Sequence, residues 1–175
     1  MRIFRDTDAL LRWAYAIAEQ PICKVSDAQR AMAGASDTNK SADGALSIQD
    51  QHGQAAMIRR YIEDMPELLQ AYAWAAYSWA EHERKGGNYM LDIHLATETG
   101  IVNGHMRFLL MRRHIELGQQ RCMSCESIAE KVGVHKRTIQ RYEPKVKQAM
   151  DALRAKFFDR ADEHFARTGL VRRAA

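Results

Sequence analysis

The sequence predicts an all-α protein of seven or eight helices with essentially no β-sheet. Ala, Leu, Met, Arg and Glu are plentiful, whereas glycine and proline number only 10 and 3 among 175 residues, a composition that favours helices. Apolar residues recur three and four positions apart in most segments, as along one face of a helix. No segment alternates polar and apolar residues with the β-branched enrichment of strands. With 46% hydrophobic residues, the chain can bury a core in one or two small domains.

The first predicted helix spans residues 7–19. Asp6 or Thr7 can cap its N-terminus, and Pro21 follows its end. The next segment is rich in Ser, Asp, Ala and Gly, and residues 34–49 are expected to form a flexible loop. Too few apolar side chains are present there to offset a backbone ordering entropy of about 1–2 kcal/mol per residue.

Four further helices are predicted in the middle of the chain. Pro66 ends one of them and opens the next, because proline fits the first position of a helix. Residues 84–88, Arg-Lys-Gly-Gly-Asn, are expected to form a turn because they hold two adjacent glycines. The expected helical ranges are residues 47 or 50 to 65, 66–83, 90–97 and 103–117.

Charge divides the chain into an acidic and a basic part. Residues 1–101 carry 10 Lys and Arg against 14 Asp and Glu, a net charge of −4, whereas residues 102–175 carry 16 against 8, a net charge of +8. We take these parts as the two expected domains. Such asymmetry indicates a polyanionic partner for the basic part, although a solvated charged surface would have the same composition.

The spacing of a helix-turn-helix occurs between Ser124 and Tyr142. Two helices that cross closely need a small residue at the crossing, and Ala129 supplies one. Four residues later, Gly133 can adopt the left-handed conformation of a sharp turn. Ile139, with Val132 and Val134, is placed to be buried between the two helices. The motif predicts a DNA-binding module; the alternative is an ordinary helical hairpin whose basic residues face water.

The predicted recognition helix would present a basic and polar face to the major groove of duplex DNA. Arg and Lys read guanine edges there, and Gln reads adenine. We expect Arg137 and Gln140 to contact bases. The other residues assigned to the DNA interface, most of them to phosphates, are His135, Lys136, Thr138, Arg141 and Lys145.

Residues 127–142 (SIAEKVGVHKRTIQRY), followed by residues 146–154 (VKQAMDALR), resemble the fourth region of bacterial sigma factors. Residues 108–115 look like the helix that precedes this region. The same module occurs in phage regulators of late transcription, including Q-type antitermination proteins, whose layout with a Trp-bearing helix near the N-terminus is also similar. The resemblance implies a phage or prophage antitermination factor that binds DNA and acts with bacterial RNA polymerase.

Pro144 departs from the pattern of this family, which continues a helix at that point. A proline inside a helix removes a hydrogen bond and costs about 3 kcal/mol. We therefore expect a break or kink there, with Pro144 at the start of a new helix that runs to about residue 168.

No enzyme and no cofactor are expected from the sequence. Cys122 and Cys125 have the spacing of half a zinc site, but a complete site needs four ligands. Cys23, His114 and His135 could complete it, although nothing in the sequence brings them together. The simpler interpretation is two reduced cysteines at a helix start.

Trp74 and Trp79 are candidates for a protein contact in the acidic part. They are five positions apart, about 140° around a helix, so both cannot lie at the centre of one narrow buried stripe. The partner would be RNA polymerase or a second protomer in a homodimer; the alternative is that both side chains belong to the core.

The expected function is therefore sequence-specific DNA binding. The expected location is the cytoplasm of a bacterial host, since the chain has no apolar run long enough for a membrane span and no secretory signal. Two alternatives remain open. One is a phage DNA-packaging recognition subunit that uses its helix-turn-helix within an oligomer. The other is a helical interaction module that does not bind DNA.

Overall fold

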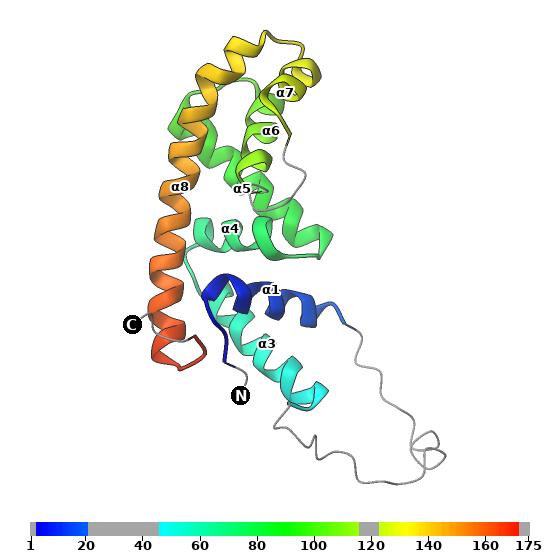
Figure 1. Ribbon diagram of the computed structural model, residues 1–175, viewed down its shortest axis with the longest axis vertical. Coiled ribbons are helices and arrows are strands. Elements are labelled where there is room, and N and C mark those ends of the chain that lie inside the picture. Colours follow the sequence, from blue (N-terminus) through cyan, green and yellow to red (C-terminus); the bar gives the residue numbers. More distant parts are fainter. Residues whose placement is uncertain (1–2, 21–45, 116–122, 172–175) are drawn as a thin grey trace, which may run out of the picture. The chain divides into compact units, whose positions relative to one another are not determined.

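The computed structural model describes residues 3–20, 46–115 and 123–171, which form seven helices and no β-sheet (Figure 1). One isolated bridge pairs Phe4 with Val171. The predicted all-α fold class is confirmed. The helices are α1 (Thr7–Ala18), α3 (Ile48–Glu63), α4 (Glu67–Tyr77), α5 (Glu81–Thr99), α6 (Gly104–Ile115), α7 (Cys125–Val132) and α8 (Lys136–Arg167).

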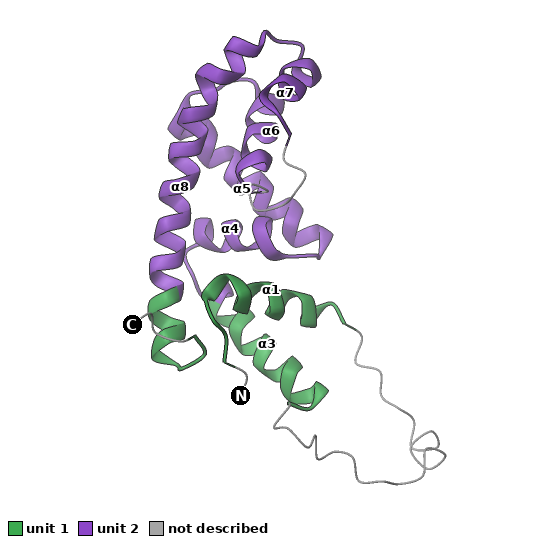
Figure 2. Ribbon diagram, in the orientation of Figure 1, with its two compact units in different colours: residues 1–61, 162–175 green, residues 62–161 purple. Residues whose placement is uncertain are grey.

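The chain divides into two compact units (Figure 2). Unit 1 comprises residues 1–61 and 162–175, and unit 2 comprises residues 62–161. The boundary expected after residue 101 falls inside unit 2, between α5 and α6. Because the last turns of α8 belong to unit 1, the two ends of the chain share one unit.

Unit 1 contains α1, most of α3 and the end of α8. Asp6 caps α1, since its side chain accepts the backbone N–H of Ala9 at 2.8 Å, as the sequence predicted. A larger set of apolar side chains from these three helices and the following turn is buried in this unit: Leu10, Leu11, Ala14, Ala55, Ile58, Phe165 and Leu170.

The loop expected at residues 34–49 lies largely outside the described residues. Its last two residues, 48 and 49, belong to α3, which agrees with the earlier of the two expected helix starts, residue 47. Ser47 explains the early start of the helix, because its hydroxyl oxygen accepts the backbone N–H of Asp50 at 3.1 Å and so caps the first turn.

The turn between α4 and α5 lies earlier than predicted. The helix expected at residues 66–83 ends at Tyr77, and the turn expected at residues 84–88 is helical. Ser78 makes the difference: its hydroxyl donates to the carboxylate of Glu83 at 2.6 Å and accepts the N–H of Ala80 at 3.1 Å. These bonds connect the residue that follows α4 to the start of α5.

Gly86 and Gly87 therefore lie inside α5, which also contains the shorter helix expected at residues 90–97. Gly87 serves packing rather than turning. A Cβ at this position would lie 2.6 Å from the carbonyl oxygen of Ala71 and 2.9 Å from the amide nitrogen of Ala75. Only a residue without a side chain lets α5 lie this close to α4.

The corner between α5 and α6 is held by Arg107. Its guanidinium donates to both carboxylate oxygens of Asp92, at 2.8 and 2.6 Å, and to the carbonyl of Ile101. The hydrogen bonds to Asp92 raise the pKa of Arg107. The helix expected at residues 103–117 is observed as α6, whose described part ends at residue 115.

The final helix, α8, runs without interruption through Pro144, so the expected start of a new helix at this residue was wrong. Pro144 cannot donate to the carbonyl of Gln140, but both residues are exposed, and water can bond that carbonyl instead. Buried residues continue in register on both sides of the proline. They are Ile139, Val146, Met150, Leu153 and Phe157.

Candidate nucleic-acid interface

The candidate interface is built on α7, the connection after it and the first turns of α8. Ser124 caps α7 by accepting the N–H of Ser127 at 3.1 Å. Gly133 ends the helix in the left-handed region, with φ 72° and ψ 34°. Nothing lies within 4 Å of a Cβ built on Gly133, so the requirement for glycine here is purely conformational.

His135 caps the start of α8. Its ring Nδ1 accepts the backbone N–H of Arg137 at 3.1 Å, and its carbonyl accepts the N–H of Thr138 at 2.8 Å. The sequence placed His135 among the DNA-binding residues. In the structure the residue is exposed, but one ring nitrogen is engaged in the helix cap.

Of the three apolar residues expected between the two helices, Ile139 is buried, whereas Val132 and Val134 are half-buried. Ile128 and Ile139 have no exposed surface, and Ala129 has almost none. Because these side chains anchor α7 and the first turn of α8 in the core of unit 2, the orientation of the opposite face of α8 is fixed by packing.

That opposite face carries the predicted DNA-binding residues. Arg137, Arg141 and Lys145 follow one another at intervals of four residues, so their side chains form a stripe along α8. With Lys136 and Gln140, these residues are exposed, and Thr138 is half-buried. A row of cations on one exposed helix face can contact successive phosphates or base edges.

The first turns of α8 carry little negative charge. Glu143 is the one acidic residue among residues 136–150, and Arg113 of α6 binds it, with Nε donating to Oε1 at 3.3 Å. A second nitrogen of Arg113 donates to the carbonyl of Met123, just before α7. Sequence reasoning missed this pair because 30 residues separate its members and no local pattern links them.

Glu126 at the start of α7 is another acidic residue of the candidate interface. Its carboxylate forms an ion pair with Lys136, and the hydrogen bond from Lys136 lowers the pKa of Glu126. Lys136 was expected to contact phosphate. To contact a phosphate, Lys136 must leave its ion pair with Glu126.

Tyr142 also lies at the candidate interface, although it is not among the residues that the sequence assigned to DNA binding. The guanidinium carbon of Arg141 lies 5.7 Å from the centre of its ring, and Nζ of Lys145 lies 5.9 Å from it. Both distances allow cation–π attraction, which would orient the two cations. The sequence feature that could have identified Tyr142 is its position between the basic residues Arg141 and Lys145.

The two candidate partner-binding tryptophans have different surroundings. Trp74 is half-buried against α5, where a Cβ on Gly87 would approach its Cβ to 3.1 Å. Its indole nitrogen is buried and has no hydrogen-bond partner among the described residues. Trp79 lies in the connection between α4 and α5 and is 69% exposed.

No group of three or more His, Cys, Asp and Glu side chains with the geometry of a metal site occurs within residues 3–20, 46–115 and 123–171. Cys125 is a free, half-buried thiol. Cys122, its partner in the suggested half-site, lies outside the described residues.

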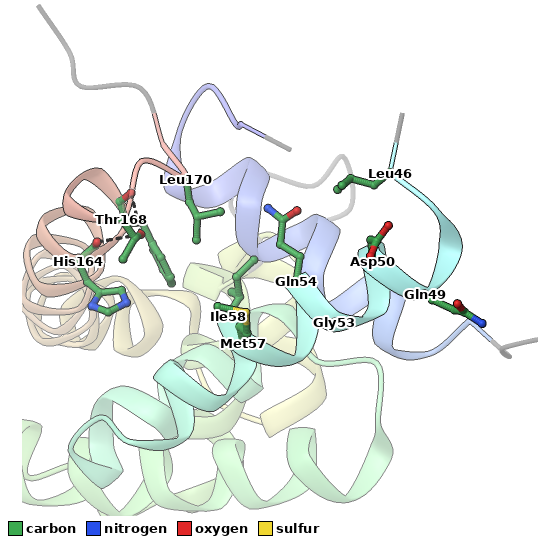
Figure 3. A pocket seen from close by; sticks show the side chains of 11 residues that line it. Leu46, Gln49, Asp50, Gly53, Gln54, Met57, Ile58, His164, Thr168 and Leu170 are labelled. Carbon is green, nitrogen blue, oxygen red and sulfur yellow. Dashed lines mark hydrogen bonds between the residues drawn. The ribbon is translucent and has the colours of Figure 1, made fainter. Parts of the chain in front are cut away.

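A pocket of about 480 Å³ lies in unit 1 (Figure 3). Side chains of α3, among them Gln54 and Ile58, line one side of it, and His164, Thr168 and Leu170 line the other. Its lining is mostly apolar, and Leu46 at its rim directly follows residues whose structure is not described.

A comparison of the sequence with protein-family models finds no match, and a comparison with curated proteins finds none either. In the part of the chain that the structure describes, no helix has the length and apolar character that crossing a membrane requires.

Proposed function

We propose that this chain is a sequence-specific DNA-binding transcription regulator that places the first turns of α8 in the major groove. The observation that carries the proposal is the stripe of Arg137, Arg141 and Lys145. It lies exposed on a helix whose opposite face is buried, and Arg113 of α6 holds the one acidic residue of these turns, Glu143.

The arrangement suits DNA better than a merely solvated surface. Solvated helix faces mix acidic and basic residues, which pair along the helix. Here the basic residues of the stripe have no acidic neighbour on their own face, and Gln140 adds a side chain that can read adenine. The exposed connection at Gly133 would let α7 approach the phosphate backbone beside the groove.

The resemblance of residues 127–154 to the fourth region of sigma factors extends the proposal. It supports a phage or prophage antitermination factor that acts with bacterial RNA polymerase, in the cytoplasm of the host. In this scheme the exposed Trp79 offers an aromatic anchor for polymerase or for a second protomer.

Selection of bound duplexes from a random pool tests the DNA-binding proposal. The wild-type protein is expected to enrich one sequence motif, whereas the double variant Arg137→Ala, Arg141→Ala enriches none. Lys85→Ala serves as the matched control, since it removes an exposed cation that is paired with Glu81 on α5, outside the interface. A wild-type protein that enriches no sequence would refute the proposal.

Transcription in vitro tests the role in antitermination. A template would carry the enriched motif upstream of a terminator, with bacterial RNA polymerase present. We expect the wild-type protein to increase read-through and Trp79→Ala to bind DNA normally but to lose this effect. Unchanged termination with bound wild-type protein would contradict the polymerase-dependent part of the proposal.

A further inference from the structure

We infer that Arg113 is a positioning residue for the DNA interface: it keeps the carboxylate of Glu143 directed toward α6 and away from the phosphates. The inference rests on the proposed function and names a residue that would control the interface without contacting DNA. Neither member of the pair is among the residues that the sequence assigned to DNA binding.

The geometry assigns Arg113 to this role. Its side chain is only 20% exposed and that of Glu143 only 28%, so the pair lies mostly between α6 and α8. The contact of Arg113 with the carbonyl of Met123 holds the guanidinium in place from a second direction. Arg113 therefore offers Glu143 a fixed cation on the side of α8 that faces the core.

Without Arg113, the carboxylate of Glu143 would turn toward another cation of α8. Lys147 is one helical turn further along α8 and is exposed, so a released carboxylate would pair with it. A free Glu143 would thus lower the positive charge around the first turns of α8, which attracts the phosphates.

The experiment compares DNA affinity in three variants: Arg113→Met, Glu143→Gln and the double variant. The probe is a duplex that the wild-type protein selects from a random pool, and its dissociation constant is measured at several salt concentrations. Arg113→Met should bind on the order of three- to tenfold more weakly, with a smaller salt slope. Glu143→Gln should bind within about twofold of wild type, and the double variant should regain that affinity.

Arg107→Met is the matched control, because it also breaks an arginine–carboxylate pair within unit 2. Its partner Asp92 lies on α5, outside the interface. This variant should have a lower thermal stability but the wild-type dissociation constant at temperatures where it remains folded. The comparison thus distinguishes a loss of stability from a loss of positioning.

A second pair of variants keeps Arg113 intact, in case Arg113→Met does not fold. Glu143→Asp retains the charge but is one methylene too short for the present contact, whereas Glu143→Gln removes the charge. We expect Glu143→Asp to bind DNA more weakly than Glu143→Gln.

Three outcomes overturn the inference. They are unchanged binding by Arg113→Met, a double variant that stays as weak as Arg113→Met, and equal binding by Glu143→Asp and Glu143→Gln. In each of these three cases the wild-type protein would still select a duplex. Failure of the wild-type protein to select any duplex would instead refute the proposed function, and this inference with it.

Discussion

The backbones of α4 and α5 lie close together where Gly87 faces Ala71. A Cβ built on Gly87 would lie 2.6 Å from the carbonyl oxygen of Ala71, a separation that real Cβ atoms do not tolerate. The neighbouring Gly86 is different, since its nearest contact would be the ring of Trp74 at 4.0 Å. Two adjacent glycines in one helix thus have different physical roles.

Gly87→Ala should destabilise the protein, and Gly86→Ala should not. The first change forces α4 and α5 apart and is expected to lower the unfolding free energy by about 1–3 kcal/mol. The second places a better helix former in open space and should raise it by about 0.5–1 kcal/mol. Urea unfolding of both variants measures the difference, and equal effects would contradict the packing role of Gly87.

Arg137→Ala and Lys145→Ala should weaken DNA binding in distinguishable ways. Loss of a base contact by Arg137 should cost about 1–3 kcal/mol at the preferred site and relax the sequence preference there. Loss of a phosphate contact by Lys145 should weaken all sequences alike and reduce the salt slope by about 0.9. Binding titrations on preferred and altered duplexes measure both effects. An unchanged site preference in Arg137→Ala would refute its assignment to bases.

Glu126→Gln should strengthen binding to duplex DNA. The change frees Lys136 from its ion pair, so that a phosphate no longer competes with a carboxylate for the ammonium. We expect a severalfold tighter complex and a salt slope steeper by about 0.9. The matched background is Lys136→Met, in which Glu126→Gln should change the salt slope much less. The same steepening with and without Lys136 would show that the ion pair is not the cause.

His114 should make stability depend on pH. Both of its ring nitrogens are buried without a partner among the described residues. Burial lowers its pKa; Glu143 and Asp151 oppose that shift, whereas Arg113 and Lys147 add to it. The unfolded chain therefore binds the proton more tightly, and the unfolding free energy should fall as the pH drops below about 6.5.

His114→Gln removes this titration, so its unfolding free energy should fall less than that of the wild type between about pH 7.5 and 5. Chemical unfolding at each pH provides the measurement. His82→Gln, which replaces an exposed histidine of α5, is the control and should retain the wild-type dependence. Identical pH profiles for the wild type and His114→Gln would exclude His114 as the source.

Local chemistry in the sequence determined the ends of several helices and the buried residues of the candidate interface. Asp6 caps α1, and Gly133 ends α7 with a positive φ, because each needs only neighbouring backbone groups to act. Ile139 is buried as expected, since helical periodicity assigns each apolar residue to a face. The exposure of the basic stripe follows from the same periodicity.

Tertiary packing decided the features that the sequence predicted wrongly or not at all. Two adjacent glycines at residues 86 and 87 predict a turn from the local sequence alone. In the folded chain Gly87 is helical and allows the close contact between α5 and α4. Pro144 remains inside α8 because the buried residues on both sides of it pack in one register, and this outweighs one hydrogen bond lost on the exposed face. The contact between Arg113 and Glu143 joins residues on two helices that are far apart in sequence. Propensity and periodicity act over a few residues, so only the folded arrangement could bring this pair together.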